Sequence, residues 1–114
     1  MHELLMADNI MDVVDLNASI ERVTAVKKIV LEVGELACAE PALLKKYLEL
    51  ALEDKFAQPA EVEILNIPVL ARCKLCETEF RLDDEIVACP VCNSVDIFYK
   101  KGREMRIKYM DVVE

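Results

Sequence analysis

Two segments of the chain carry apolar residues at helical spacing, separated by polar positions. In residues 4–16 aspartates alternate with an apolar stripe made of Leu4, Ala7, Met11 and Val14, widened by Leu5 and Ile10. This pattern predicts an amphipathic helix that ends near Asn17 and Ser19. The second pattern, residues 40–56, has Glu40 as a candidate N-cap and Pro41 at the first helical position. Its predicted buried stripe is Leu44, Tyr47, Leu48, Ala51 and Leu52.

Three other segments predict β-strands. Residues 23–33 are rich in β-branched residues, and Ile29, Leu31 and Val33 alternate on one face. Residues 61–70 form a second candidate strand, in which Pro68 removes a donor and marks an edge or an end of the pairing. Alternation of apolar and polar residues returns after Gly102 and predicts the third strand. The order strand, helix, strand predicts that the first two strands lie parallel.

The segment between the second and third predicted strands is polar and contains four cysteines in two CxxC pairs. Cys73 and Cys76 are followed after twelve residues by Cys89 and Cys92. Two such pairs can place four thiolates around one tetrahedral Zn²⁺ ion, with no position left for a substrate. A rubredoxin-like iron site and four unrelated reduced cysteines are the alternatives. The fifth cysteine, Cys38, is expected to be a small buried apolar side chain.

These patterns together predict an α/β (α+β) fold: a small three-stranded sheet with two helices, plus an inserted zinc-ribbon-like four-cysteine domain. The expected domains are 1–70 plus 101–114 for the helices and sheet, and 71–100 for the insertion between the second and third strands.

Charge and composition narrow the classes of function. The formal net charge of −8 opposes binding to nucleic acid, because phosphate contacts need a basic surface. No signal peptide or membrane span is expected, and paired cysteines without a disulfide framework indicate a reducing cytoplasm. The sequence offers no nucleophile paired with a base, so an enzyme is not expected. A monomer is the default expectation, although sheet edges permit a homo-oligomer.

The chain places its only histidine at position 2. The terminal amine of Met1, the amide nitrogen of His2 and its imidazole can form adjoining chelate rings around square-planar Ni(II) or Cu(II), with Glu3 as the nearest further donor. The alternative is an exposed terminal histidine without a role.

In combination these features resemble the HypA/HybF family of nickel metallochaperones. The resemblance runs through the opening Met1–Glu3, the sequence Val-Gly-Glu-Leu at 33–36, both CxxC pairs, and Gly-Arg-Glu-Met-Arg-Ile at 102–107. It implies that Met1, His2 and Glu3 belong to a nickel site, to which Glu40 also maps, and that Cys73, Cys76, Cys89 and Cys92 bind zinc. The histidines that some members add to the zinc pairs or to the nickel site have no counterpart here.

The resemblance also implies a function and partners. The chain is expected to carry Ni(II) during [NiFe]-hydrogenase maturation, with a GTPase of that pathway and the hydrogenase large-subunit precursor as partners. The alternative is a zinc-ribbon protein-interaction module that transfers no nickel.

Overall fold

The computed structural model describes residues 2–82 and 88–113 of the 114-residue chain. Its elements follow in the order α1 (His2–Glu21), β1 (Ala25–Gly34), a 3-10 turn (Glu35–Ala37), α2 (Pro41–Phe56), β2 (Glu61–Ile67), β3 (Leu70–Cys73), β4 (Glu79–Arg81), β5 (Ile97–Lys101) and β6 (Met105–Val113). They divide into two compact units. The helical unit comprises Met1–Glu32, Ala39–Leu65 and Arg106–Glu114, and the cysteine unit comprises Val33–Cys38 and Asn66–Met105.

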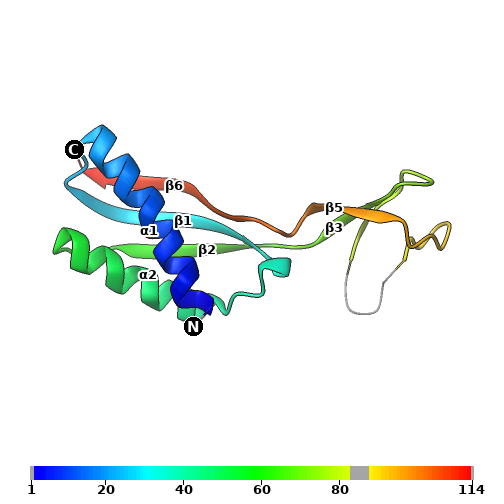
Figure 1. Ribbon diagram of the computed structural model, residues 1–114, viewed down its shortest axis with the longest axis horizontal. Helices are drawn as coiled ribbons and strands as arrows, with labels where there is room; N and C mark the ends of the chain where they lie inside the picture. The colour runs from blue at the N-terminus through cyan, green and yellow to red at the C-terminus, as the bar shows by residue number, and fades with distance from the viewer. Residues whose placement is uncertain (1, 83–87, 114) are drawn as a thin grey trace. The chain divides into compact units, whose positions relative to one another are not determined.

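The predicted three-stranded sheet is present with the strand order β2-β1-β6. Figure 1 shows β1 and β2 running in the same direction, as the strand-helix-strand order predicts, and β6 running in the opposite direction. Helices α1 and α2 pack against each other. The domain ranges expected from the sequence differ in extent from the two units, because residues 33–38, 66–70 and 101–105 group with the cysteines.

The core of the helical unit comes from the central strand and from one stripe of each helix. In α2 the buried residues are Leu44, Leu48 and Leu52, while Tyr47 and Ala51 are only half-buried. In α1 the buried residues are Ala7, Ile10 and Val14. Strand β1 adds Val26, Ile29, Val30 and Leu31. Val33, which the sequence placed on the same face as Ile29 and Leu31, is buried too but belongs to the cysteine unit.

Helix α1 is longer than predicted and ends without a polar cap. The side chain of Asn17 donates to the carbonyl of Val13 at 2.8 Å inside the helix, so this residue does not terminate it. The helix ends instead at Glu21, after which Arg22 has a positive φ of 56° and the Val23 amide returns to the Ala18 carbonyl at 3.1 Å. This is a Schellman motif built without glycine. The prediction that the helix ends near Asn17 was therefore wrong.

Three predictions of burial were also wrong. Leu4 and Leu5 are 37% and 64% exposed, because the buried face of α1 is centred on Ala7, Ile10 and Val14. Cys38 is exposed, since it ends the surface 3-10 turn in the left-handed conformation at φ 56°. Burial was predicted from the helical stripe for the two leucines and from the residue type for Cys38, and the tertiary packing decided otherwise.

The cysteine unit contains a second sheet that the sequence did not predict. Strand β3 lies between β4 and β5 and pairs antiparallel with both, so that Ala71 lies opposite Phe80 on one side and Tyr99 on the other. The predicted strand 61–70 ends at Ile67, just before Pro68, and Leu70 starts the strand of this new sheet.

Neither helix of the described residues is long and apolar enough to cross a lipid bilayer.

Candidate metal centre

The first pair of cysteines lies on a turn that begins at the last residue of β3. The Cys73 amide donates to the Thr78 carbonyl at 2.9 Å, and the Glu77 amide donates to the Cys73 carbonyl at 3.0 Å. Glu77, directly after the second cysteine, has a positive φ of 66°. These bonds turn the chain tightly around the two sulfur atoms.

The second pair repeats this turn with the same hydrogen bonds. The Cys89 amide donates to the Ser94 carbonyl and the Asn93 amide donates to the Cys89 carbonyl, both at 2.9 Å. Asn93 has a positive φ of 63°, matching the position and conformation of Glu77. The two CxxC segments are therefore a pair of equivalent knuckles, as a tetrahedral metal site requires.

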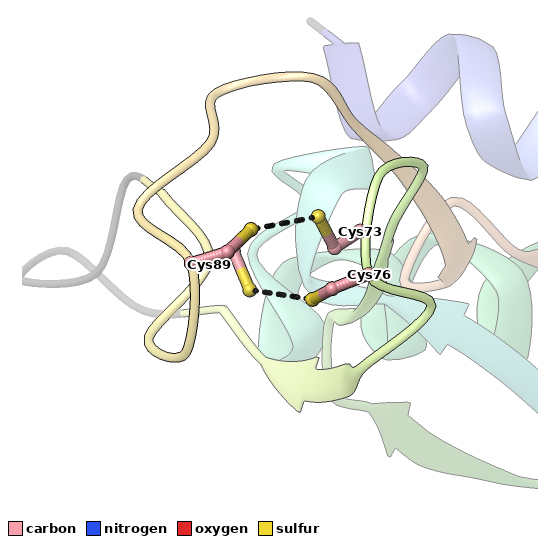
Figure 2. A group of neighbouring side chains, drawn as sticks. Cys73, Cys76 and Cys89 are labelled. Atoms are coloured by element: carbon pink, nitrogen blue, oxygen red, sulfur yellow. Dashed lines mark hydrogen bonds between the residues drawn. The ribbon is translucent and has the colours of Figure 1, made fainter.

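The two knuckles face each other and bring their sulfur atoms together. The Sγ atoms of Cys73 and Cys92 are 3.5 Å apart, as are those of Cys76 and Cys89, and all four lie within 4.8 Å of one another. Figure 2 shows the side chains of Cys73, Cys76 and Cys89 converging on one small volume. A tetrahedron with zinc–sulfur bonds of about 2.3 Å has sulfur–sulfur edges of about 3.8 Å. The cluster fits a structural zinc ion, and the reading of four unrelated cysteines was wrong.

Hydrogen bonds tune the thiols of this cluster. The hydroxyl of Thr78, whose Oγ1 is 3.2 Å from the Cys76 sulfur, and then the Thr78 amide lower the pKa of Cys76 to about 6. The Cys76 amide is the largest influence that lowers the pKa of Cys73. At Cys92 the Ser94 amide lowers the pKa, but the Cys73 sulfur and burial outweigh it and raise it to about 12. Thiolates therefore form readily on the first knuckle, and the metal must displace the remaining protons.

Thr78 and Ser94 are site residues that the sequence reasoning missed. Each stands two positions after the second cysteine of its pair, and each supplies the carbonyl that closes its knuckle. The signal was present in the sequence, because both pairs read Cys-x-x-Cys-x followed by a hydroxyl residue.

The cysteines also form much of the small core of their unit. The buried cluster consists of Ala71, Cys73, Phe80 and Cys89, with Leu82 and Ile97 packed against it. Cys76 and Cys92, by contrast, are exposed. One cysteine of each pair thus faces the β-sheet and the other faces solvent.

The Val-Gly-Glu-Leu and Gly-Arg-Glu-Met motifs meet inside the cysteine unit. The Gly34 amide donates to the Glu104 carbonyl at 2.8 Å, and the Leu36 amide donates to the Gly102 carbonyl at 2.7 Å. A Cβ atom on Gly34 would overlap the Gly102 carbonyl, so this close backbone approach requires glycine. Arg81 and Glu35 add an exposed ion pair at 3.6 Å.

The candidate nickel residues lie at the amino-terminal ends of two helices of the helical unit. His2 and Glu3 form the first turn of α1, and Glu40 is the N-cap of α2; Met1 lies outside the described residues. The backbone amide of Glu40 donates to Glu3 Oε1 at 3.2 Å, which brings the two acidic residues together across 37 positions of sequence. Sequence reasoning grouped Met1, His2 and Glu3 through their chelate chemistry, whereas Glu40 joined them only through the family resemblance.

Both carboxylates are held by backbone amides. Glu40 accepts from the amides of Ala42 and Leu43 at 3.3 and 2.9 Å, as the predicted N-cap should. The amides of Glu3 and Glu40 lower the pKa of the Glu3 carboxyl. The end of α1 that carries the histidine therefore also carries an ionised carboxylate at neutral pH.

Comparison with known proteins places this geometry in a family. The family model described as "Hydrogenase/urease nickel incorporation, metallochaperone, hypA" matches residues 1–112. The hydrogenase maturation factor HypA of Trichodesmium erythraeum is 35% identical over 114 residues, which cover 100% of this chain and 97% of that protein. The corresponding factor of Dechloromonas aromatica is 32% identical over 112 residues, covering 98% and 99%.

Solved structures show the same fold. The solution structure of the Ni metallochaperone HypA from Helicobacter pylori matches with a TM-score of 0.71 and 21% identity, covering 99% of this chain and 98% of that one. Together with the match of the family model across almost the whole sequence, these relatives show that the chain belongs to the HypA family of nickel-incorporation metallochaperones.

Proposed function

We propose that this chain binds Ni(II) at its amino terminus and delivers it during [NiFe]-hydrogenase maturation, while zinc at Cys73, Cys76, Cys89 and Cys92 has a structural role. The proposed nickel donors are the Met1 amine, the amide and imidazole nitrogens of His2, and Glu3. The observation that carries the proposal is the hydrogen bond from the Glu40 amide to the Glu3 carboxylate, which brings Glu40 to the residue next to the only histidine. Family membership supports nickel as the cargo.

The chemistry of these donors suits transfer. Nitrogen donors in a plane match the preference of Ni(II). His2 is exposed, so a partner's ligands can reach its imidazole. Glu40 serves first as a helix cap, with both of its oxygens accepting backbone amides. We therefore assign it the role of positioning Glu3, with direct ligation as the alternative.

The proposed partners are a GTPase of the maturation pathway and the hydrogenase large-subunit precursor, and the proposed compartment is the cytoplasm. Passing nickel from this chain to its partners requires no reaction catalysed by the chain itself. The closed set of four thiolates offers no open position for activating water.

A nickel titration tests this proposal. Zinc-loaded protein with its native amino terminus, the His2→Ala variant, and a version with one residue added before Met1 are titrated with Ni(II), and zinc is quantified in each. The imidazole signals in the NMR spectrum come from His2 alone, since the chain has one histidine, and they report binding directly. One nickel per native chain, lost in both variants while one zinc stays, is the expected result. Nickel binding that survives both changes would reject the amino-terminal site.

One observation favours the alternative of a zinc-stabilised interaction module. Leu75 and Val91 occupy the same position in the two knuckles, and both are exposed. Exposed aliphatic side chains at a rigid turn are typical of a contact surface. Absence of nickel binding by the native protein, with zinc content intact, would favour this alternative.

A further inference from the structure

Helix α1 has a second apolar face, which points to solvent. Leu5, Val13, Leu16 and Ile20 are 64%, 48%, 62% and 71% exposed, although all four are large and aliphatic. We call these four residues, together with Asn9 among them, the outer stripe. A surface helix ordinarily buries its apolar residues and exposes polar ones, so an exposed apolar face of this size indicates a contact surface.

The outer stripe is continuous and distinct from the buried face. At 3.6 residues per turn, its apolar residues fall within an arc of about 80°, centred about 130° from the buried residues Ala7, Ile10 and Val14. From Leu5 to Ile20 it extends over about 22 Å at 1.5 Å per residue. Spacings of three and four residues around a central Asn9 are those of a helix seam that packs against another helix.

One border of the stripe is acidic. The helical repeat places Asp8, Asp12 and Asp15 side by side along this border, and Asp15 pairs with Lys55 of α2 at 2.7 Å. No lysine or arginine occurs anywhere in α1. The complement of such a surface is an apolar helix with basic residues along one side.

The same charge argues against other occupants. A second copy of the chain would bring two acidic helices together within an assembly whose subunits each carry a net charge of −8. Helices that lie on lipid surfaces carry Lys and Arg on their polar face, and anionic headgroups would repel the aspartates.

We propose that the outer stripe of α1 is the docking surface for an amphipathic helix with a basic flank, supplied by a protein that exchanges nickel with this chain. The helical repeat places His2 on the same side of α1 as the stripe. A helix seated there ends beside the proposed nickel residues. The inference deepens the proposed function and rests on it for the nature of the partner, whereas the docking chemistry stands on the stripe itself.

The test uses a synthetic helical peptide with leucines along one side and lysines along its flank, and a counterpart with glutamates in place of the lysines. Binding to the zinc-loaded full chain is measured by fluorescence anisotropy at two salt concentrations. We expect the lysine peptide to bind and the glutamate peptide not to bind. The double variant Leu16→Ser/Ile20→Ser should weaken it by about tenfold or more, as loss of central apolar contacts does at interfaces.

Two controls fix the location and the charge dependence. Leu50→Ser removes a leucine of α2 that is 56% exposed outside the stripe, and it should leave binding unchanged. Asp8→Asn/Asp12→Asn should weaken binding and flatten its dependence on salt. Circular dichroism of each variant checks the fold, which these exposed positions should leave intact.

Other outcomes overturn the proposal. Failure of the lysine peptide to bind, or equal binding by the Leu16→Ser/Ile20→Ser variant, excludes the stripe as the docking surface. A dimer in light scattering that this variant abolishes identifies a second copy as the occupant, and flotation with phosphatidylglycerol vesicles that it abolishes identifies a membrane. Nickel titration of the same samples separates the two proposals, because docking without nickel refutes only the proposed function, and nickel without docking refutes only this inference.

Discussion

Each of the two units of this protein is stabilised in a different way. The helical unit has a core of aliphatic side chains from two helices and a central strand, including Leu44, Leu48, Leu52 and Ile29. Among the residues of the cysteine unit that the structure describes, the core cluster has four buried members, and two of them are the candidate metal ligands Cys73 and Cys89. So small a core cannot offset the entropy of ordering its chain, and metal coordination supplies the difference.

The largest expected effect is loss of the metal from the cysteine unit alone. Chelation of zinc, or the substitution Cys73→Ser, should unfold β3, β4 and β5 while the helical unit stays folded, since structural zinc contributes about 10–16 kcal/mol of apparent binding energy in small modules. Elemental analysis and two-dimensional NMR measure both outcomes. Cys38→Ser is the matched control, because Cys38 is exposed and outside the cluster, and it should retain one zinc. If the amide signals of the cysteine unit keep their native dispersion after zinc is removed, the unit does not depend on the metal and the comparison between the two units is refuted.

The converse change destabilises the helical unit and leaves the metal in place. Leu48 is fully buried in α2, so Leu48→Ala should lower the free energy of unfolding of this unit by about 2–5 kcal/mol. Leu50→Ala, at an exposed position of the same helix, should change it by no more than about 0.5 kcal/mol. Urea denaturation followed by circular dichroism measures the difference. Zinc content should stay at one in both variants, and its loss from Leu48→Ala would mean that the units fold as one.

A smaller effect is expected where two backbones meet in the cysteine unit. Gly34→Ala would force a methyl group against the Gly102 carbonyl, which no side-chain rotation relieves, and we expect destabilisation of about 1–3 kcal/mol. The neighbouring variant Glu35→Gln removes only the exposed ion pair with Arg81 and should cost less than about 1 kcal/mol. Hydrogen exchange of the Leu36 amide, which bonds to Gly102, is the direct readout. Equal protection in Gly34→Ala and the native chain would contradict the close approach.

The smallest effect compares one substitution in both units. Ala57 and Asn93 both have a left-handed backbone, with φ of 55° and 63°. Ala57→Gly should stabilise the helical unit by about 0.5–1 kcal/mol, because alanine is strained in this conformation and glycine is not. Asn93→Gly should gain less, since asparagine tolerates the conformation and the knuckle is already fixed by its metal. The midpoints of urea denaturation of the two variants measure both stabilisations. A larger gain in stability from Asn93→Gly than from Ala57→Gly would contradict this ranking.

Element types were predictable from the sequence, but several boundaries were not. A glycine just after the last turn is a common sequence signal for the end of a helix, and this chain has only two glycines. The left-handed position after α1 is therefore occupied by Arg22, which does not read as a stop. The end of α2 at Phe56 was predicted correctly, although Ala57 holds the left-handed position after it. Strands β4 and β5 escaped prediction because they are three and five residues long and are stabilised by pairing with β3.

The sequence by itself determined the four-thiolate cluster, because the CxxC spacing fixes each pair of sulfurs through local hydrogen bonds such as that from Glu77 to Cys73. It also determined that two helices and a three-stranded sheet form, since periodicity is a local property. Only the tertiary structure decided which apolar face of α1 is buried, and that Leu5 and Cys38 are exposed. It likewise brought Glu3 to Glu40, because contacts between residues far apart in sequence depend on how the helices pack.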